Sequence, residues 1–406
     1  MTRSVVVTGF GLVTPIGNTV GDVLSALDRA RGVAAVVPEL VADNVAVPFA
    51  ATVADFAAAP GLTDRRRKYY SRSAEMAVTA ALAAVSHSGL SGDPLLRGAG
   101  VAVGVGSGGA PPMEFAVREA AGDPTGTTAL LVPLAMPNSP AAALALTLGA
   151  HGSATTYAAA CASGTTAIGE AFRKVQYGEL DVAVAGGTDA PVTPHIMTGM
   201  ARLGVMATAS DDPGRACRPF DADRSGLVLA EGAAFLVLEE ETRARARGAT
   251  VLGRILGYGT TSDAHHPLAP DASGAGGAQA IESALLDAKL NPAEIGHING
   301  HGTGTRAGDA AEARSYRTVF GDACPPVTTC KGVTGHLFGA AGAMEAIVAF
   351  ECARLGTVFP VGNLRQPDVD IDVVAGTTRR IDPTPVLSHS YGFGGHNSSL
   401  VLSPER

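Results

Sequence analysis

Short apolar runs without polar alternation recur along this chain, and helix-forming segments lie between them. In the first half, such runs cover residues 4–11 (SVVVTGFG), 100–109 (GVAVGVGSGG) and 180–187 (LDVAVAGG). Strands of this kind are buried on both faces, which indicates sheets that helices cover on both sides. A helix of strong helix formers is expected over residues 71–90. The pattern therefore predicts an α/β fold.

The second half repeats this element order in a shorter form. A strand over 249–259 and a helix over 277–290 open it, and a hairpin over 385–405 closes it. From this order we expect an internal duplication with two halves, residues 1–245 and residues 246–406.

Composition narrows the classes of function. The chain has 406 residues, of which 46% are hydrophobic and 17% charged, and this argues against a disordered chain. The formal net charge of -8 argues against a nucleic-acid partner bound by phosphate neutralisation. The short apolar run after the N-terminus predicts a first strand and not a signal peptide. No run of about 20 residues is free of helix breakers, so we expect no membrane partner and a cytoplasmic location.

The five cysteines are an odd number and contain no CxxC pair, which argues against a disulfide framework and a zinc site. They are Cys161, Cys217, Cys324, Cys330 and Cys352.

Cys161 lies where an extended run becomes a helix. The apolar residues after it have helical spacing, at Ala167, Ile168, Ala171, Phe172 and Val175. The free N–H groups and positive dipole end of a helix N-terminus favour a thiolate at this position. Small neighbouring residues leave room for an incoming acyl group. The alternative interpretation is an inert buried cysteine, a common fate of free thiols.

Two histidines lie in turns of the second half. His301 follows a strand in NGHGTGTRAGD, where Thr303 and Thr305 could offer hydroxyls to a polar ligand. His336 lies in CKGVTGHLFGAAGAMEA, after Lys331 and before a helix rich in glycine and alanine. Together with a cysteine, such imidazoles suit thiol catalysis, because they can donate hydrogen bonds to a developing oxyanion or move protons. For His301 the alternative is a satisfied turn histidine, and a metal site would need another ligand and a tighter cluster.

Two further stretches have both a functional and a purely structural interpretation. SHSYGFGGHNSS is a glycine-flanked turn with Phe393 at its centre, and its backbone N–H groups could supply an oxyanion-hole donor. It could equally be a plain tight turn. The basic run DRRRKYYSR, residues 64–72, could dock an acidic partner or could be the solvated start of a helix.

Taken together, these stretches resemble one family. ACASG around Cys161, HGTGT from His301, KGVTGH to His336 followed by GAAGA, and GFGGHN from Gly392 are similar to motifs of the β-ketoacyl-ACP synthases. The similarity is closer still to the elongating Cys-His-His type of fatty acid and type II polyketide pathways. VVVTGFGLVTPIGN at the start and CRPFDADRSGLVLAEGAA in the middle agree with the same pattern. The resemblance covers essentially the whole chain and implies the thiolase fold, a duplicated α/β unit in five layers (αβαβα).

The resemblance implies a decarboxylative Claisen condensation that yields a β-ketoacyl-ACP. Cys161 would accept an acyl chain from an acyl carrier protein as a thioester. His301 and His336 would assist decarboxylation of malonyl-ACP and stabilise the enolate. The backbone N–H groups of Cys161 and Phe393 would form the oxyanion hole, with Gly394 in the same turn, and Phe393 would gate the acyl pocket.

The resemblance also implies supporting residues and partners. Lys331 and Glu312 would be charges near the histidines, and Thr303 and Thr305 would meet the pantetheine arm. No metal or other cofactor is implied, since the substrates are carried on the phosphopantetheine of the carrier protein. Carrier proteins are acidic, so the implied docking charges are Arg65, Arg66, Arg67, Lys68 and Arg202.

Four positions depart from the family pattern. Leu227 replaces an aromatic residue that normally packs near the malonyl group, and Ser225 replaces an aspartate. Leu268 replaces a threonine, and Leu134 stands where a basic residue often lies. Leu227 keeps open a second reaction, acyl transfer without decarboxylation.

A third possibility is a non-catalytic partner subunit of the chain-length-factor type. Proteins with the thiolase fold pair through a sheet edge beside the nucleophile strand, here residues 153–160. The chain is therefore expected to form a homodimer, or a heterodimer with a related subunit.

Overall fold

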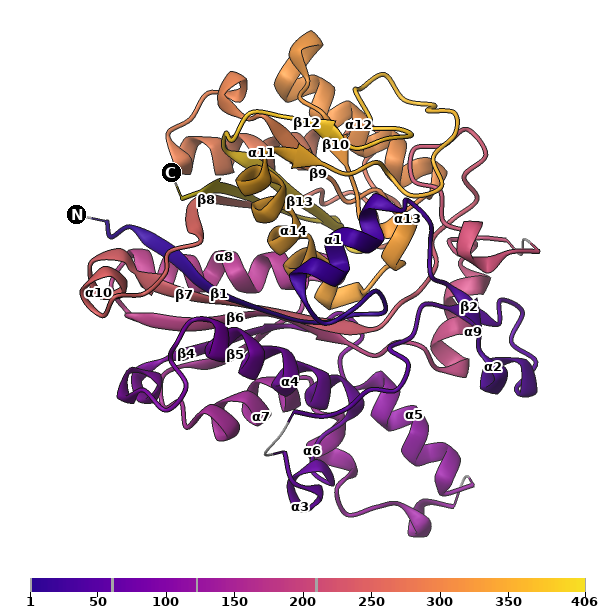
Figure 1. Ribbon diagram of the computed structural model, residues 1–406. Helices are drawn as coiled ribbons and strands as arrows, with labels where there is room; N and C mark the ends of the chain where they lie inside the picture. The colour runs from indigo at the N-terminus through magenta and orange to yellow at the C-terminus, as the bar shows by residue number, and fades with distance from the viewer. Residues whose placement is uncertain (1, 60–61, 122, 209–210, 406) are drawn as a thin grey trace.

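The computed structural model describes residues 2–59, 62–121, 123–208 and 211–405. Five strands of the first half form one side of the central sheet (Figure 1). They are β1 (Val5–Val13), β4 (Gly100–Gly104), β5 (Ala154–Tyr157), β6 (Val182–Asp189) and β7 (Gly232–Glu240). Their spatial order is β5-β4-β6-β7-β1, in which β5, β4 and β6 are parallel and β7 runs antiparallel to both neighbours.

Five strands of the second half repeat this arrangement. They are β8 (Gly253–Ser262), β9 (His297–Asn299), β10 (Val327–Thr328), β13 (Val386–Gly392) and β14 (His396–Pro404). Their order is β10-β9-β13-β14-β8, so in each half the third strand in sequence is at the edge and the first is at the opposite end. The directions also agree, and an antiparallel pairing of β1 with β8 joins the halves. The duplication predicted from element order is therefore confirmed, while the division at residue 245 stays a prediction.

Helices and sheets alternate in five layers, as the thiolase fold requires. The helices α4 (Arg72–His87) and α7 (Ser139–Leu148) cover the outer face of the first sheet half. The helices α8 (Ser163–Gln176) and α14 (Ala341–Leu355) lie between the two sheet halves, and α11 (Ala275–Ala288) covers the far face with α12 (Arg306–Phe320) against it (Figure 1). Separate apolar clusters fill these interfaces, and nearly all of α14 is buried. The α/β fold class is therefore confirmed.

Small residues let the central helices approach closely. A Cβ added to Gly164 of α8 would lie 2.6 Å from the carbonyl oxygen of Gly339, and one added to Gly342 of α14 would overlap the hydroxyl of Thr165. The glycine and alanine run after His336 is thus explained by packing against α8, as its composition indicates.

The remaining elements lie at the ends and over the faces of the sheet. They are α1 (Val20–Asp28), α2 (Pro38–Ala42), α3 (Asp64–Arg67), α5 (Ala110–Glu119), α6 (Leu131–Ala135), α9 (Pro194–Arg202), α10 (Glu241–Ala246), α13 (Lys331–Thr334), and the short strands β2 (Ala35–Val36), β3 (Phe49–Ala50), β11 (Thr357–Val358) and β12 (Arg379–Arg380). Among the described residues, no helix combines the length and the hydropathy that crossing a membrane would require.

Candidate active site

Cys161 lies in the tight connection between β5 and α8. The residue before it, Ala160, has a left-handed φ of 48°, a conformation that non-glycine residues adopt at some energetic cost. The cysteine side chain is 7% exposed and faces a cavity of about 310 Å³. The predicted position at a helix N-terminus is thus observed, and the thiol retains a path to the cavity.

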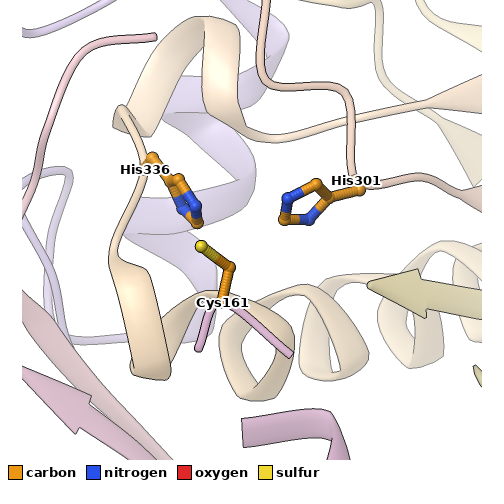
Figure 2. A group of neighbouring side chains, drawn as sticks. All are labelled: Cys161, His301 and His336. Carbon is orange, nitrogen blue, oxygen red and sulfur yellow. The ribbon is translucent and has the colours of Figure 1, made fainter. Parts of the chain in front are cut away.

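Both predicted histidines reach the same cavity from the second half of the chain. His301 follows β9, and His336 follows α13. The sulfur of Cys161 and a ring nitrogen of each histidine all lie within 4.8 Å of one another. Figure 2 shows both imidazoles pointing toward the sulfur, and the two rings meet edge to face with centroids 5.3 Å apart. Residues 140 and 175 positions away from the cysteine therefore converge on it.

A buried ammonium group orients His301. Lys331 Nζ donates hydrogen bonds to the carbonyl oxygen of His301 (2.6 Å) and to Glu345 Oε1 (2.5 Å), and it lies 3.3 Å from His301 Nδ1. Since an ammonium only donates, Nδ1 is the acceptor and the ring proton lies on Nε2. Burial, the Lys331 charge and His336 lower the pKa of His301 well below its usual value. His301 is therefore a neutral imidazole that can donate from Nε2.

His336 is held by its backbone and has a free ring. Its N–H donates to the carbonyl oxygen of Val228 (2.7 Å), and its carbonyl oxygen accepts from the N–H of Ala230 (2.9 Å). Its side chain is 1% exposed, and neither ring nitrogen has a hydrogen-bond partner among the described residues. Burial and the charge of Lys331 lower its pKa well below the usual value. A buried, unpaired imidazole costs free energy, which a bound ligand atom could recover.

Two carboxylates shape the turn that carries His301. Glu312 accepts hydrogen bonds from the N–H groups of His301 (2.6 Å) and Gly302 (2.7 Å), and from the hydroxyl of Tyr316 (2.6 Å). Asp309 accepts from the N–H groups of the next two residues of the turn, both at 3.1 Å. Burial raises the pKa of Glu312 to about 7 and that of Asp309 to about 6. Both carboxylates lie on α12, a helix that the sequence analysis did not predict.

The ionisation predicted for Cys161 was wrong. Burial raises its pKa to about 12, and the charge of Asp189 raises it as well. The Lys331 ammonium and the backbone N–H groups of Phe393 and Cys161 act in the opposite direction without overcoming burial. Desolvation of the sulfur therefore outweighs the helix terminus, and in the free protein the nucleophile is a thiol. The two N–H groups nevertheless face the sulfur, where an oxyanion hole is predicted.

The turn that contains Phe393 approaches the nucleophile at backbone level. A Cβ added to Gly392 would lie 2.5 Å from the carbonyl oxygen of Ala159 and 3.3 Å from the nitrogen of Cys161. Gly394 and Gly395 have φ values of 85° and 77°, which favour glycine. The glycines of this motif are thus explained by the close approach and the turn.

The cavity unites most, but not all, of the predicted site residues. Thr303, Thr305, Glu312 and Phe393 line it with the three reactive residues. Leu227 and Leu268, two of the departures from the family pattern, line it as well. Lys331 lies behind His301, and Gly394 lies next to two lining residues.

The predicted docking cations lie outside the cavity. Arg202 is exposed on α9, between the lining residues Met200 and Leu203. On and just after α3, Arg65, Arg66 and Lys68 are exposed, and Arg67 is half-buried in an ion pair with Glu75 (3.1 Å). Of the described residues that line the cavity, none belongs to α3.

Sequence reasoning missed three residues of the site. Asp189, at the end of β6, is buried and accepts hydrogen bonds from the N–H groups of Gly106 (2.6 Å) and Gly339 (2.8 Å). Glu345 pairs with Lys331, and Tyr391 lines the cavity 6.1 Å from the His301 ring. An acidic residue inside an otherwise apolar strand or helix was the available signal for Asp189 and Glu345.

The same three reactive residues could hold a metal. One thiol and two imidazoles within 4.8 Å match the ligand types of a zinc site that keeps an open position. However, the Lys331 ammonium beside His301 would repel a cation. The expectation that the site works without a metal stays a prediction.

Comparisons with known proteins agree with this geometry. Residues 2–244 match the family described as Beta-ketoacyl synthase, N-terminal domain, and residues 252–365 match Beta-ketoacyl synthase, C-terminal domain. A 3-oxoacyl-[acyl-carrier-protein] synthase 2 of Synechocystis sp. is 37% identical, with 98% of each chain covered. A protein of the same name from Staphylococcus aureus is 36% identical over the same share of each chain.

Three solved structures resemble the whole chain. A beta-ketoacyl synthase from Burkholderia phymatum has a TM-score of 0.94 and 34% identity. The ishigamide ketosynthase/chain length factor has a TM-score of 0.89 and 33% identity. AntDE:AntF, a type II polyketide synthase acyl-carrier protein in complex with its ketosynthase, has a TM-score of 0.91 and 27% identity. Each similarity covers 100% of both chains.

Proposed function

This chain belongs to the β-ketoacyl synthase family, and from that premise we propose that it elongates an acyl chain by a decarboxylative Claisen condensation. A Cys161-bound acyl group and malonyl-ACP give β-ketoacyl-ACP and carbon dioxide. The observation that carries this proposal is the convergence of the Cys161 sulfur with two neutral, buried imidazoles on one cavity. The pathway is a type II fatty acid or polyketide pathway.

In the first step, the Cys161 sulfur attacks the thioester carbonyl carbon of acyl-ACP. The carbonyl oxygen gains negative charge and accepts hydrogen bonds from the N–H groups of Cys161 and Phe393, which both face the sulfur. The carrier's pantetheine sulfur leaves and takes the proton lost by the thiol, so acyl-S-Cys161 and free carrier thiol result. The raised pKa of Cys161 supports a transfer in which the thiol loses its proton only as substrate arrives.

In the second step, malonyl-ACP loses its carboxyl group as carbon dioxide. The electron pair of the broken bond forms an enolate, whose oxygen would accept hydrogen bonds from His301 and His336. Neutral imidazoles suit this role because each can donate one N–H, and Lys331 places the His301 proton on Nε2. The enolate carbon then attacks the acyl thioester, and the Cys161 sulfur leaves as a thiolate that takes a proton from solvent.

Partners follow from the same proposal. The substrates are carried on phosphopantetheine, so we propose an acyl carrier protein as partner, docked by Arg202 and the cations at 65–68. The pantetheine arm would pass Thr303 and Thr305 at the cavity. AntDE:AntF is a ketosynthase in complex with its carrier protein, which supports this assignment.

We propose that the chain forms a dimer through the edge strand β5, with itself or with a related subunit. The strand is at the end of the sheet and is only partly buried. A cytoplasmic location fits the five unpaired cysteines, because a reducing compartment keeps thiols free.

The test is incubation with acyl-ACP and malonyl-ACP, followed by intact-protein mass spectrometry and measurement of carbon dioxide. We expect an acyl adduct on Cys161 with acyl-ACP and carbon dioxide release once malonyl-ACP is added, and we expect no adduct on Cys161→Ala with acyl-ACP. An adduct without carbon dioxide would instead indicate the acyltransferase that Leu227 keeps open. Neither signal would indicate a partner subunit and would contradict the proposal.

A further inference from the structure

A second cavity, of about 570 Å³, lies apart from the candidate active site. Its lining shares no residue with the cavity that contains Cys161. Five arginines line it, together with two carboxylates, Asp211 and Asp212. The arginines are Arg29, Arg31, Arg215, Arg218 and Arg365. They come from three separate parts of a chain whose overall net charge is -8, so the concentration of positive charge is local.

The arginines are only partly compensated within the protein. Asp212 forms ion pairs with Arg31 (2.9 Å) and with Arg215 (3.3 Å). Among the described ranges, no ion pair joins Arg29 or Arg365 to a carboxylate, and both are exposed. Convergence of like charges costs free energy in the empty protein, and an anion bound between them would recover it.

Hydrogen bonds and close backbone contacts hold the chain segments beneath this cavity together. The Asn363 side-chain nitrogen donates to the carbonyl oxygens of Gly214 (2.9 Å), Cys217 (3.0 Å) and Gly332 (3.1 Å). A Cβ added to Gly32 would overlap the backbone of both Gly214 and Gly332. The segment after α1 therefore lies directly against α13, as Figure 1 also shows. The backbone on this side of the cavity is therefore held in place, while the exposed arginine side chains would become ordered when a ligand binds.

From these observations we propose that this arginine cavity binds a small anion with two or more phosphate groups, of the pyrophosphate or nucleoside diphosphate class. A guanidinium presents a planar fork that matches phosphate oxygens in pairs of hydrogen bonds. Arg31 and Arg215 already pair with Asp212, so the groups left for an anion are those of Arg29, Arg218 and Arg365. These come from three separate segments, and linked phosphates would reach more of them than one phosphate. The volume also falls within the usual range of small-molecule sites, and the concave shape favours a small ligand over a flat protein surface.

The test is calorimetric titration of the full-length protein with inorganic pyrophosphate, ADP and orthophosphate in a buffer without phosphate. We expect pyrophosphate and ADP to bind at least about tenfold more tightly than orthophosphate. Arg29→Ala combined with Arg365→Ala should weaken pyrophosphate binding at least about tenfold, and the corresponding double lysine variant should weaken it less. The matched control, Arg97→Ala with Arg314→Ala, removes two exposed arginines elsewhere and should leave binding unchanged.

Three results would overturn the proposal. The first is no binding of pyrophosphate by the unmodified protein. The second is an equal loss in the control variant, which would indicate a general charge effect. The third is that pyrophosphate does not bind, while a purified acyl carrier protein binds to the unmodified protein and not to the Arg29→Ala, Arg365→Ala variant. This result would identify the face as a protein docking surface. None of these measurements depends on condensing activity, so the proposal stands or fails separately from the proposed function.

Discussion

The Cys161 thiol lies at the N-terminus of α8 and also in the protein interior, and these surroundings act in opposite directions on its pKa. Because burial raises the pKa to about 12, the thiolate fraction should rise about tenfold per pH unit from about pH 7 to about pH 9. Alkylation by iodoacetamide, followed on the peptide that contains Cys161, should rise in the same proportion. A small free thiol in the same buffers should level off near its own pKa, and the same levelling for Cys161 would contradict the assignment.

The buried Lys331–Glu345 pair is a second test at the scale of residues. Both side chains are 1% exposed, so Glu345→Ala leaves an ammonium buried without a carboxylate. We expect a loss of about 3 kcal/mol in the free energy of unfolding, measured by urea titration. Glu345→Gln keeps an acceptor for Lys331 and should lose less. Equal midpoints for the alanine variant and the unmodified protein would contradict a stabilising role of the pair.

At the scale of elements, the contact between α8 and α14 sets the distance between the nucleophile and His336. Gly342→Ala should cost about 1–3 kcal/mol of stability, because the added methyl overlaps the Thr165 hydroxyl. Adding Thr165→Ala to this variant removes the overlap, so the double variant should be more stable than the sum of the single changes predicts. Gly199→Ala is the matched control, since nothing lies within 4 Å of its added Cβ. Strict additivity would show that the helices shift freely.

The elements that sequence could predict are those with strong local patterns. The buried strands, α4 and α11 follow from apolar runs and helix formers, and the edge position of β5 follows from the family resemblance. The helix α12 was missed because its polar residues Asp309 and Glu312 are buried. Both accept hydrogen bonds from the turn just before the helix, and Asp309 also accepts one from the N–H of Phe220, far away in the sequence. Periodicity does not record such tertiary hydrogen bonds.

The same limit applies to the site. Cys161, His301 and His336 were predicted from motifs, and the structure brings them together. The pKa of the thiol could not be predicted, since it depends on how much protein surrounds the sulfur. The arginine cavity was equally hidden, because its arginines are scattered between residues 29 and 365.

At the scale of the whole molecule, the exposed edge strand β5 predicts that two chains associate along it. Leu146 on α7 is 71% exposed, and α7 packs beside the edge strand β5. Leu146→Glu should shift a dimer toward the monomer in light scattering after size exclusion, because a charge would be buried in the interface. Leu286→Glu, on the outer helix α11 and 80% exposed in the monomer, should leave the mass unchanged. A dimer that survives Leu146→Glu would place the interface elsewhere.

The antiparallel pairing of β1 with β8 joins two halves that have the same topology but contribute different catalytic residues. One half contributes the sulfur and the other contributes both imidazoles, so neither is a working enzyme in isolation. A chain cut in the connector between α10 and β8 would therefore yield two inactive fragments. Any activity regained on mixing them would measure the fraction of molecules in which β1 and β8 pair again.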